Sequence, residues 1–150
     1  QTGKVRKAPI GPADVAIVRT LLEEVRPQLI FVAGDLSDPH GTHRMCKEAI
    51  DRALGEMNGP PPETWLYRGA WQEWPVTDAT WLVPMSQEEL KLKIQAIFKH
   101  QSQKDSAPFP GAHDDREFWQ RVEARNKETA AMLNRLGLAE YCAMEAYVVA

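Results

Sequence analysis

Apolar residues are distributed along the chain in two patterns, a helical spacing and short continuous runs. A spacing of three or four positions predicts helices over residues 12–26, 42–57, 86–100 and 116–136. Short apolar runs lie between them, and the first, Leu29-Ile30-Phe31-Val32-Ala33, predicts a strand. That run has no polar alternation, which is typical of a strand covered on both faces. The other predicted strands are 64–67, 79–83 and 141–149.

The order of these elements indicates the fold class. A helix followed at once by an apolar strand is half of a β-α-β unit, so we predict an α/β fold with a mostly parallel sheet. Ser86 and Glu89 have the capping-box spacing of a helix start, and Gly137 is expected to end the last helix. The helix positions that we expect to be buried are Val15, Val18, Leu21, Leu22, Val25, Met45, Ala49, Ile50, Ala53, Leu54, Leu90, Ile94, Ile97, Phe98, Phe118, Val122, Ala130, Met132 and Leu133.

Length and composition are those of one soluble globular domain. The chain has 150 residues, of which 26% are charged and 43% hydrophobic. Its net charge of −3 gives no electrostatic reason for a nucleic-acid partner. The apolar runs are far shorter than the ~20 residues of a membrane span, so we predict no membrane association. Cys46 and Cys142 form no CxxC motif, which indicates reduced thiols and a cytoplasmic location.

The start of the chain has the character of a connecting segment. The first residue is Gln1, and no signal peptide follows it. Residues 1–11 are basic and contain a glycine and a proline. We therefore expect the chain to be a piece of a longer protein. A homo-oligomer is also compatible with the sequence.

Candidate chemistry is concentrated between the first predicted strand and the helix after it. Asp35 and Asp38 follow the strand, and His40 and His43 come next. Ligands of open α/β sheets bind at the carboxyl ends of strands. Two histidines three positions apart at a helix start lie near one face, and imidazole is a common zinc ligand. Alternatively, both histidines are helix-cap and surface residues. Cys46 is expected to be a core thiol rather than a further ligand.

Several segments together resemble a known family. Residues 38–43, Asp-Pro-His-Gly-Thr-His, follow a strand that ends in Ala-Gly-Asp-Leu, and this resembles the His-x-x-His segment of the PIG-L/LmbE-like zinc de-N-acetylases. Residues 93–103 are similar to the Lys…Ala…His-x-Ser-Gln pattern of that family. Residues 67–74 and 116–119 resemble the C-terminal, deacetylase-like half of bacterial glucosamine-6-phosphate deaminase-like proteins. The resemblance runs from near Gln1 to the end of the chain.

The resemblance implies a fold and a set of roles. The fold would be Rossmann-like, with a mostly parallel sheet flanked by helices, and residues 1–150 would be the C-terminal part of the deacetylase domain, lacking its first strand or strands. His43 would bind zinc or another divalent metal. His40 would polarise the acetyl carbonyl or stabilise the oxyanion. The substrate would be an N-acetylated amino sugar or sugar phosphate.

One part of the family's metal site has no counterpart in this chain. In the family, a His-Pro-Asp-Asp segment after the first strand supplies further ligands and the general base. His113-Asp114-Asp115 has a similar composition, but it lies in a late loop and we do not assign it that role. A catalytic zinc takes three protein ligands and a water, so His43 alone is too few. Either a missing N-terminal segment of the same protein (with a deaminase-type domain before it) or a partner completes the site, or the chain is an inactive remainder.

A second candidate site is the segment around Arg68. Arg68 lies close in sequence to Trp71 and Trp74. A guanidinium can hold a phosphate, and indoles can stack on sugar faces. Arg68 and Trp71 are therefore predicted to bind substrate. The alternative is structural packing with a surface ion pair between Arg68 and Glu73.

Other polar residues have two interpretations each. Asp38 is predicted to hydrogen-bond a ligand histidine, although it could equally cap the following helix. Asp35 could contact the metal region. His100 and Gln103 match a family motif but could be structural. Arg116 and Arg121 are expected on a solvated helix face.

The function predicted from the sequence is that of a zinc-dependent de-N-acetylase-like domain that is incomplete in this chain. Whether it is active as an enzyme therefore stays open. The alternative is a non-catalytic sugar-binding or interaction module of a glucosamine-6-phosphate deaminase-like protein. A deaminase proper is a weaker option, because nothing in these 150 residues supplies its chemistry.

Overall fold

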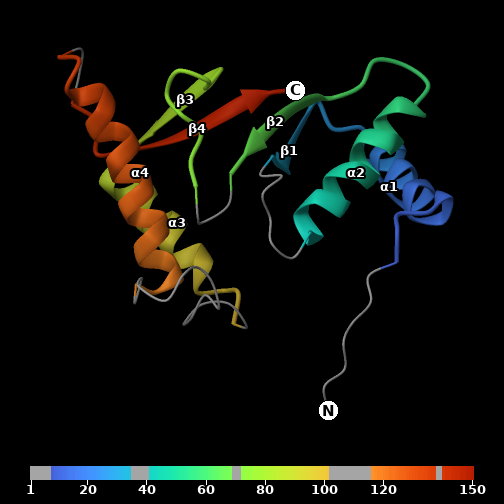
Figure 1. The fold of residues 1–150 in the computed structure, drawn as a ribbon, viewed down its shortest axis with the longest axis horizontal. Coiled ribbons are helices and arrows are strands. Elements are labelled where there is room, and N and C mark those ends of the chain that lie inside the picture. Colours follow the sequence, from blue (N-terminus) through green and yellow to red (C-terminus); the bar gives the residue numbers. More distant parts are fainter. Residues whose placement is uncertain (1–7, 35–40, 69–71, 102–115, 138–139) are drawn as a thin grey trace. The chain divides into compact units, whose positions relative to one another are not determined.

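The computed structural model describes residues 8–34, 41–68, 72–101, 116–137 and 140–150. These residues form helices and strands that alternate along most of the chain (Figure 1). The elements are α1 (Pro12–Val25), β1 (Leu29–Ala33), α2 (Thr42–Gly55), β2 (Glu63–Tyr67), β3 (Trp81–Met85), α3 (Gln87–Ile97), α4 (Phe118–Asn134) and β4 (Ala143–Val149). Every predicted helix and strand is therefore present, with ends that differ by a few residues.

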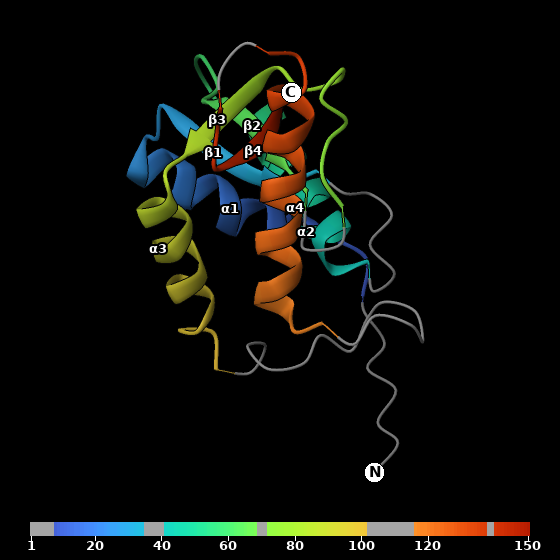
Figure 2. The same ribbon diagram turned by 90° about the vertical axis from the view of Figure 1, so that its left-hand side faces the viewer.

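The fold class is α/β, as predicted, but the sheet is mixed. Its four strands have the order β1-β2-β4-β3, and β3 and β4 run antiparallel. The chain between these two strands contains two helices, α3 and α4, which pack side by side and run in opposite directions (Figure 2). Because each helix reverses the chain, two helices in succession return β4 antiparallel to β3. The sheet is thus only partly parallel.

The chain divides into two compact units, residues 1–65 with Ala150 and residues 66–149. In the first unit, α1 packs against α2. Val15, Leu22 and Ala53 form its buried core. Arg52 of α2 donates a hydrogen bond to the carbonyl oxygen of Ile10 (2.9 Å), which fixes the chain just before α1.

Two predictions about burial in the first unit were wrong. Leu21 and Val25 of α1 are 57% and 62% exposed, because the core side of the helix is formed by Val15 and Leu22. In β1, Val32 is buried but Phe31 is 54% exposed, so β1 is not covered on both faces by the described residues. The Phe31 ring instead lies edge-on to Trp65 of β2, with centroids 5.8 Å apart.

The second unit is built on the β3–β4 pair. Trp81 lies opposite Tyr147, and Met85 lies opposite Ala143. Pro84 lies within β3 rather than after it, which is tolerated because β3 is at an edge of the sheet. Helix α4 packs on β4 and α3 packs on α4. The buried apolar residues of this unit are Leu66, Leu90, Val122, Ala130, Ala143, Met144 and Ala146.

The helix ends of the second unit match the sequence in part. The predicted capping box is present, because the Ser86 amide donates to the Glu89 carboxylate and the Glu89 amide donates to the Ser86 hydroxyl. Helix α4 ends at Asn134, and Gly137 follows with a left-handed φ of 73°. Arg121 is buried rather than solvated, and its Nε donates to the carbonyl oxygen of Arg116 (3.1 Å). Among the predicted core positions, Phe98 and Met132 are exposed.

No helix in the described ranges is both long and apolar enough to cross a membrane.

Candidate functional site

The start of α2 places His43 as the sequence predicts. His43 is the second residue of the helix and is exposed. Gly41 is the N-cap, and its φ of 66° is a left-handed conformation that favours glycine. The amide of Met45 donates to the carbonyl oxygen of Gly41 (3.0 Å), which closes the first turn. The Gly-Thr-His sequence thus sets the point at which the helix begins.

The described residues do not make up a metal site around His43. Within them, no three histidine, cysteine, aspartate or glutamate side chains gather closely enough to hold a metal ion. His43 alone supplies one ligand, whereas a catalytic zinc takes three from the protein. Cys46 is an exposed free thiol, so the prediction that it belongs to the core was wrong. Cys142 is also a free thiol, as predicted.

Several predicted site residues lie outside the part of the chain that the structure describes. They are Asp35, Asp38, His40, Trp71, Gln103 and the segment 113–115. The N-cap of α2 is Gly41 rather than Asp38, the residue considered for that position. The contact of Asp38 with a histidine stays a prediction. His100 lies in the turn after α3, where its amide donates to the carbonyl oxygen of Ile97 (2.9 Å).

Arg68 and Trp74 come together as the sequence suggested. The guanidinium carbon of Arg68 lies 4.2 Å from the Trp74 ring centroid. Arg68 Nη1 donates to Gln72 Oε1 (3.2 Å), and Trp74 Nε1 donates to the carbonyl oxygen of Leu66 (2.8 Å). A guanidinium over an indole is attracted by the negative face of the ring and keeps N–H groups free to point elsewhere. The Nε of Arg68 is buried and has no hydrogen-bond partner among the described residues.

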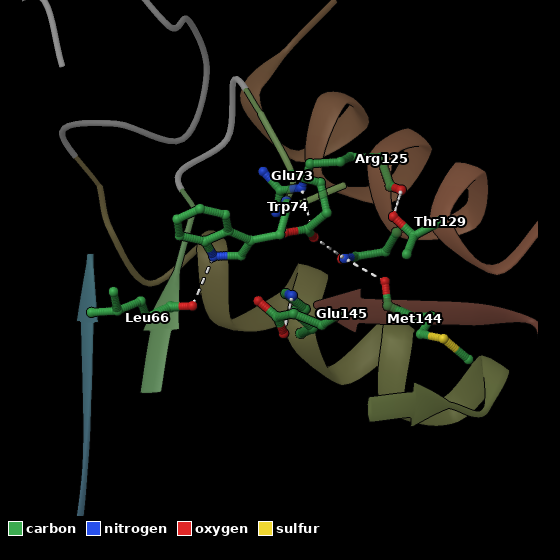
Figure 3. Close-up of polar contacts among 9 residues, drawn as sticks. Leu66, Glu73, Trp74, Arg125, Thr129, Met144 and Glu145 are labelled. Atoms are coloured by element: carbon green, nitrogen blue, oxygen red, sulfur yellow. Dashed lines mark hydrogen bonds and ion pairs between the residues drawn. The ribbon is translucent and has the colours of Figure 1, made fainter. Parts of the chain in front are cut away.

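Glu73 does not pair with Arg68 but belongs to a polar network on α4 (Figure 3). Its Oε2 lies 3.3 Å from Arg125 Nε, and the two side chains are only 9% and 12% exposed. Its Oε1 accepts a hydrogen bond from the Trp74 amide (3.1 Å). Asn126 Nδ2 donates to the carbonyl oxygen of Met144 (3.0 Å) and to Glu73 Oε2 (3.5 Å). The surface ion pair considered for Arg68 and Glu73 is therefore replaced by a buried one.

A second ion pair belongs to the same region. Lys93 Nζ of α3 lies 2.6 Å from Glu145 Oε2 of β4. Burial raises the pKa of Glu73, and the nearby positive charge of Arg125 offsets only part of that rise. Burial, followed by the negative charge of Glu145, also raises the pKa of Tyr147. The site thus holds closely spaced charges in a partly dry environment.

This network was missed from the sequence, although a signal was present. Asn126 lies four residues after Val122 and four before Ala130, on the apolar stripe of α4, and it is fully buried. A polar residue at such a position requires a buried partner. The stripe therefore indicated a polar contact but not its partner, since Glu73 is 53 residues away.

Comparison with known proteins adds a relative but no family. No family model matches the chain. A protein of Bacteroides thetaiotaomicron named "Putative glucosamine-6-phosphate deaminase-like protein" is 53% identical over 154 residues, which is 99% of this chain. The chain is related to part of that protein. It spans only 23% of the relative's length, so most of the relative lies outside the matched region.

Proposed function

We propose that this chain is the C-terminal part of a de-N-acetylase-like domain within a larger glucosamine-6-phosphate deaminase-like protein. The observation that carries the proposal is the position of His43, in the first turn of a helix that follows an apolar strand. That is the place where the resemblance requires a metal ligand. The longer relative at 53% identity supports membership of a larger protein.

In this proposal the rest of the site comes from other parts of the protein. The sheet belongs to a Rossmann-like domain whose first strand and His-Pro-Asp-Asp segment precede this chain. His43 is one ligand of zinc or another divalent metal, and His40 stabilises the oxyanion of the amide substrate. The substrate is an N-acetylated amino sugar or sugar phosphate.

The test uses the full-length protein that contains this sequence. Acetate release from N-acetylglucosamine 6-phosphate is measured for the wild type, for His43→Ala and for Arg44→Ala. Arg44 lies in the same exposed turn, and a guanidinium does not ligate metals. We expect His43→Ala to lower kcat/KM by about 100-fold or more and Arg44→Ala to leave it unchanged. A wild type that releases no acetate with metal supplied in excess would contradict the proposal.

A second candidate function is favoured by the Arg68–Trp74 pair. A guanidinium held over an indole can bind a phosphate while the ring stacks on a sugar, so the chain could be a non-catalytic module for amino-sugar phosphates. Trp71 would be a further stacking residue. In this case, glucosamine 6-phosphate binds without dependence on His43.

The two candidates are separated by binding measured next to turnover. Arg68→Ala is expected to weaken glucosamine 6-phosphate binding by about 10-fold, since a charge-assisted phosphate contact is lost. Arg135→Ala removes the same charge from an exposed position at the end of α4 and is the matched control. Binding that depends on Arg68, together with no acetate release, supports the module. Equal affinities of Arg68→Ala and Arg135→Ala would reject it.

A further inference from the structure

Glu73 links the Arg68–Trp74 pair to helix α4 within the second unit. It precedes Trp74 in sequence, and both of its carboxylate oxygens have partners. Oε1 accepts from the Trp74 amide (3.1 Å), and Oε2 contacts Arg125 (3.3 Å) and Asn126 (3.5 Å). One side chain therefore connects the backbone at Trp74 to two consecutive residues of α4.

Trp74 is held at two points. Its backbone amide is bound by Glu73, and its indole Nε1 donates to the carbonyl oxygen of Leu66 in β2 (2.8 Å). Figure 3 shows the ring extending from the Glu73 side of the network to the strand. Arg68 lies over this ring and donates to Gln72. The direction of the guanidinium therefore depends on where the ring is fixed.

The α4 end of this connection is rigidly supported. Asn126 is fully buried and donates to Met144 in β4 (3.0 Å). The Thr129 hydroxyl donates to the carbonyl oxygen of Arg125 (3.0 Å). The α4 residues that contact the Glu73 carboxylate are therefore themselves hydrogen-bonded to β4 and within the helix.

We infer that Glu73 is a positioning residue, which fixes Trp74 so that Arg68 is oriented to bind the phosphate of an amino-sugar phosphate. This inference rests on the second proposed function, the binding of amino-sugar phosphates. Glu73 touches no ligand in this role. It acts through Trp74, whose amide it binds and on whose ring Arg68 lies.

The sign of a charge change separates positioning from simple electrostatics. Glu73 is an anion near a cation that is proposed to bind phosphate. The negative charge of Glu73 repels a phosphate, so by electrostatics alone the removal of that charge strengthens phosphate binding. If Glu73 fixes Trp74, its removal weakens binding instead. Glu145→Gln is the matched control, because it removes one charge and the ion pair with Lys93, and Glu145 has no hydrogen bond to Trp74 among the described residues.

The experiment is titration of the chain with inorganic phosphate and with glucosamine 6-phosphate, well below the unfolding temperature. Glu73→Ala is expected to raise Kd about 10-fold. Glu73→Gln keeps an acceptor for the Trp74 amide but loses the charge that faces Arg125, so its Kd should rise about 3-fold. Glu145→Gln should bind as tightly as the wild type or more tightly.

The outcomes distinguish this inference from the function on which it rests. A wild type that binds neither ligand, or binds equally after Arg68→Ala, overturns both. Binding that depends on Arg68 but is unchanged or tighter in both Glu73 variants overturns the positioning role alone. Equal weakening by Glu145→Gln and Glu73→Ala also overturns it, because general loosening of the unit would then explain both. If Glu73→Ala does not fold, Glu73→Gln decides: a rise in Kd supports the inference and an unchanged Kd rejects it.

Discussion

The start of α2 and the network around Glu73 differ in how their residues are held. At the start of α2, His43 is exposed, and its position is set by a local feature, the left-handed Gly41. In the network, Glu73 and Arg125 are almost fully buried and connect segments distant in sequence. The first arrangement follows from a short sequence motif. The second exists only when the second unit has folded, so its residues are sensitive to changes elsewhere in that unit.

The largest effect should come from breaking the buried ion pair. Arg125→Met leaves the Glu73 carboxylate buried without its cation, and we expect the free energy of unfolding to fall by about 3 kcal/mol. Lys127→Met is the control, because the Lys127–Glu123 pair is on the surface, with Lys127 53% exposed, and should change stability by less than about 0.5 kcal/mol. Urea unfolding measures both. Similar losses in the two variants would show that the buried ion pair contributes no more to stability than the surface pair does.

The secondary structure, but not this network, was predictable from the sequence. Helix and strand periods are local, so α2 and α3 were placed within a few residues. The antiparallel β3–β4 pair was also open to prediction, since two helices in succession reverse the chain twice. The partner of Glu73 was not, because residues 53 positions apart in sequence meet only in the fold.

Exposure was predicted less well than the elements themselves. An apolar period identifies a face of a helix but does not tell whether another element covers it. Leu21 and Val25 share the period of Leu22, yet they remain exposed. The same holds for Phe31 in β1. The metal site could not be completed from the sequence for a different reason, since the chain has no counterpart of the His-Pro-Asp-Asp segment that the resemblance requires for the further ligands.

A smaller effect should appear as a dependence of stability on pH. The pKa of Glu73 is raised above 4.5 in the folded state, so the folded state binds its proton at a higher pH than the unfolded state does. The stability contribution of Glu73 should therefore increase as pH falls through the folded pKa towards 4.5. Glu73→Gln should lack this increase. Unfolding free energies from pH 7 to pH 4.5 test it, and identical profiles for both proteins would contradict the raised pKa.

The smallest effect should come from the cap of α2. Gly41→Ala places a side chain at a φ of 66° and should lower stability by about 1 kcal/mol. Gly55→Ala at the other end of the helix meets no atom within 4 Å and should raise stability by about 0.5 kcal/mol. Thermal unfolding of the two variants gives the comparison. A stabilising Gly41→Ala would show that the left-handed cap does not set the position of His43.

The central claim, that His43 is a metal ligand in a larger de-N-acetylase-like site, is tested most directly by metal content. The full-length protein is saturated with zinc, dialysed and analysed as wild type, His43→Ala and Arg44→Ala. We predict about one zinc per chain in the wild type and in Arg44→Ala, and loss of that zinc in His43→Ala. A wild type without zinc, or a His43→Ala variant that keeps it, would contradict the claim.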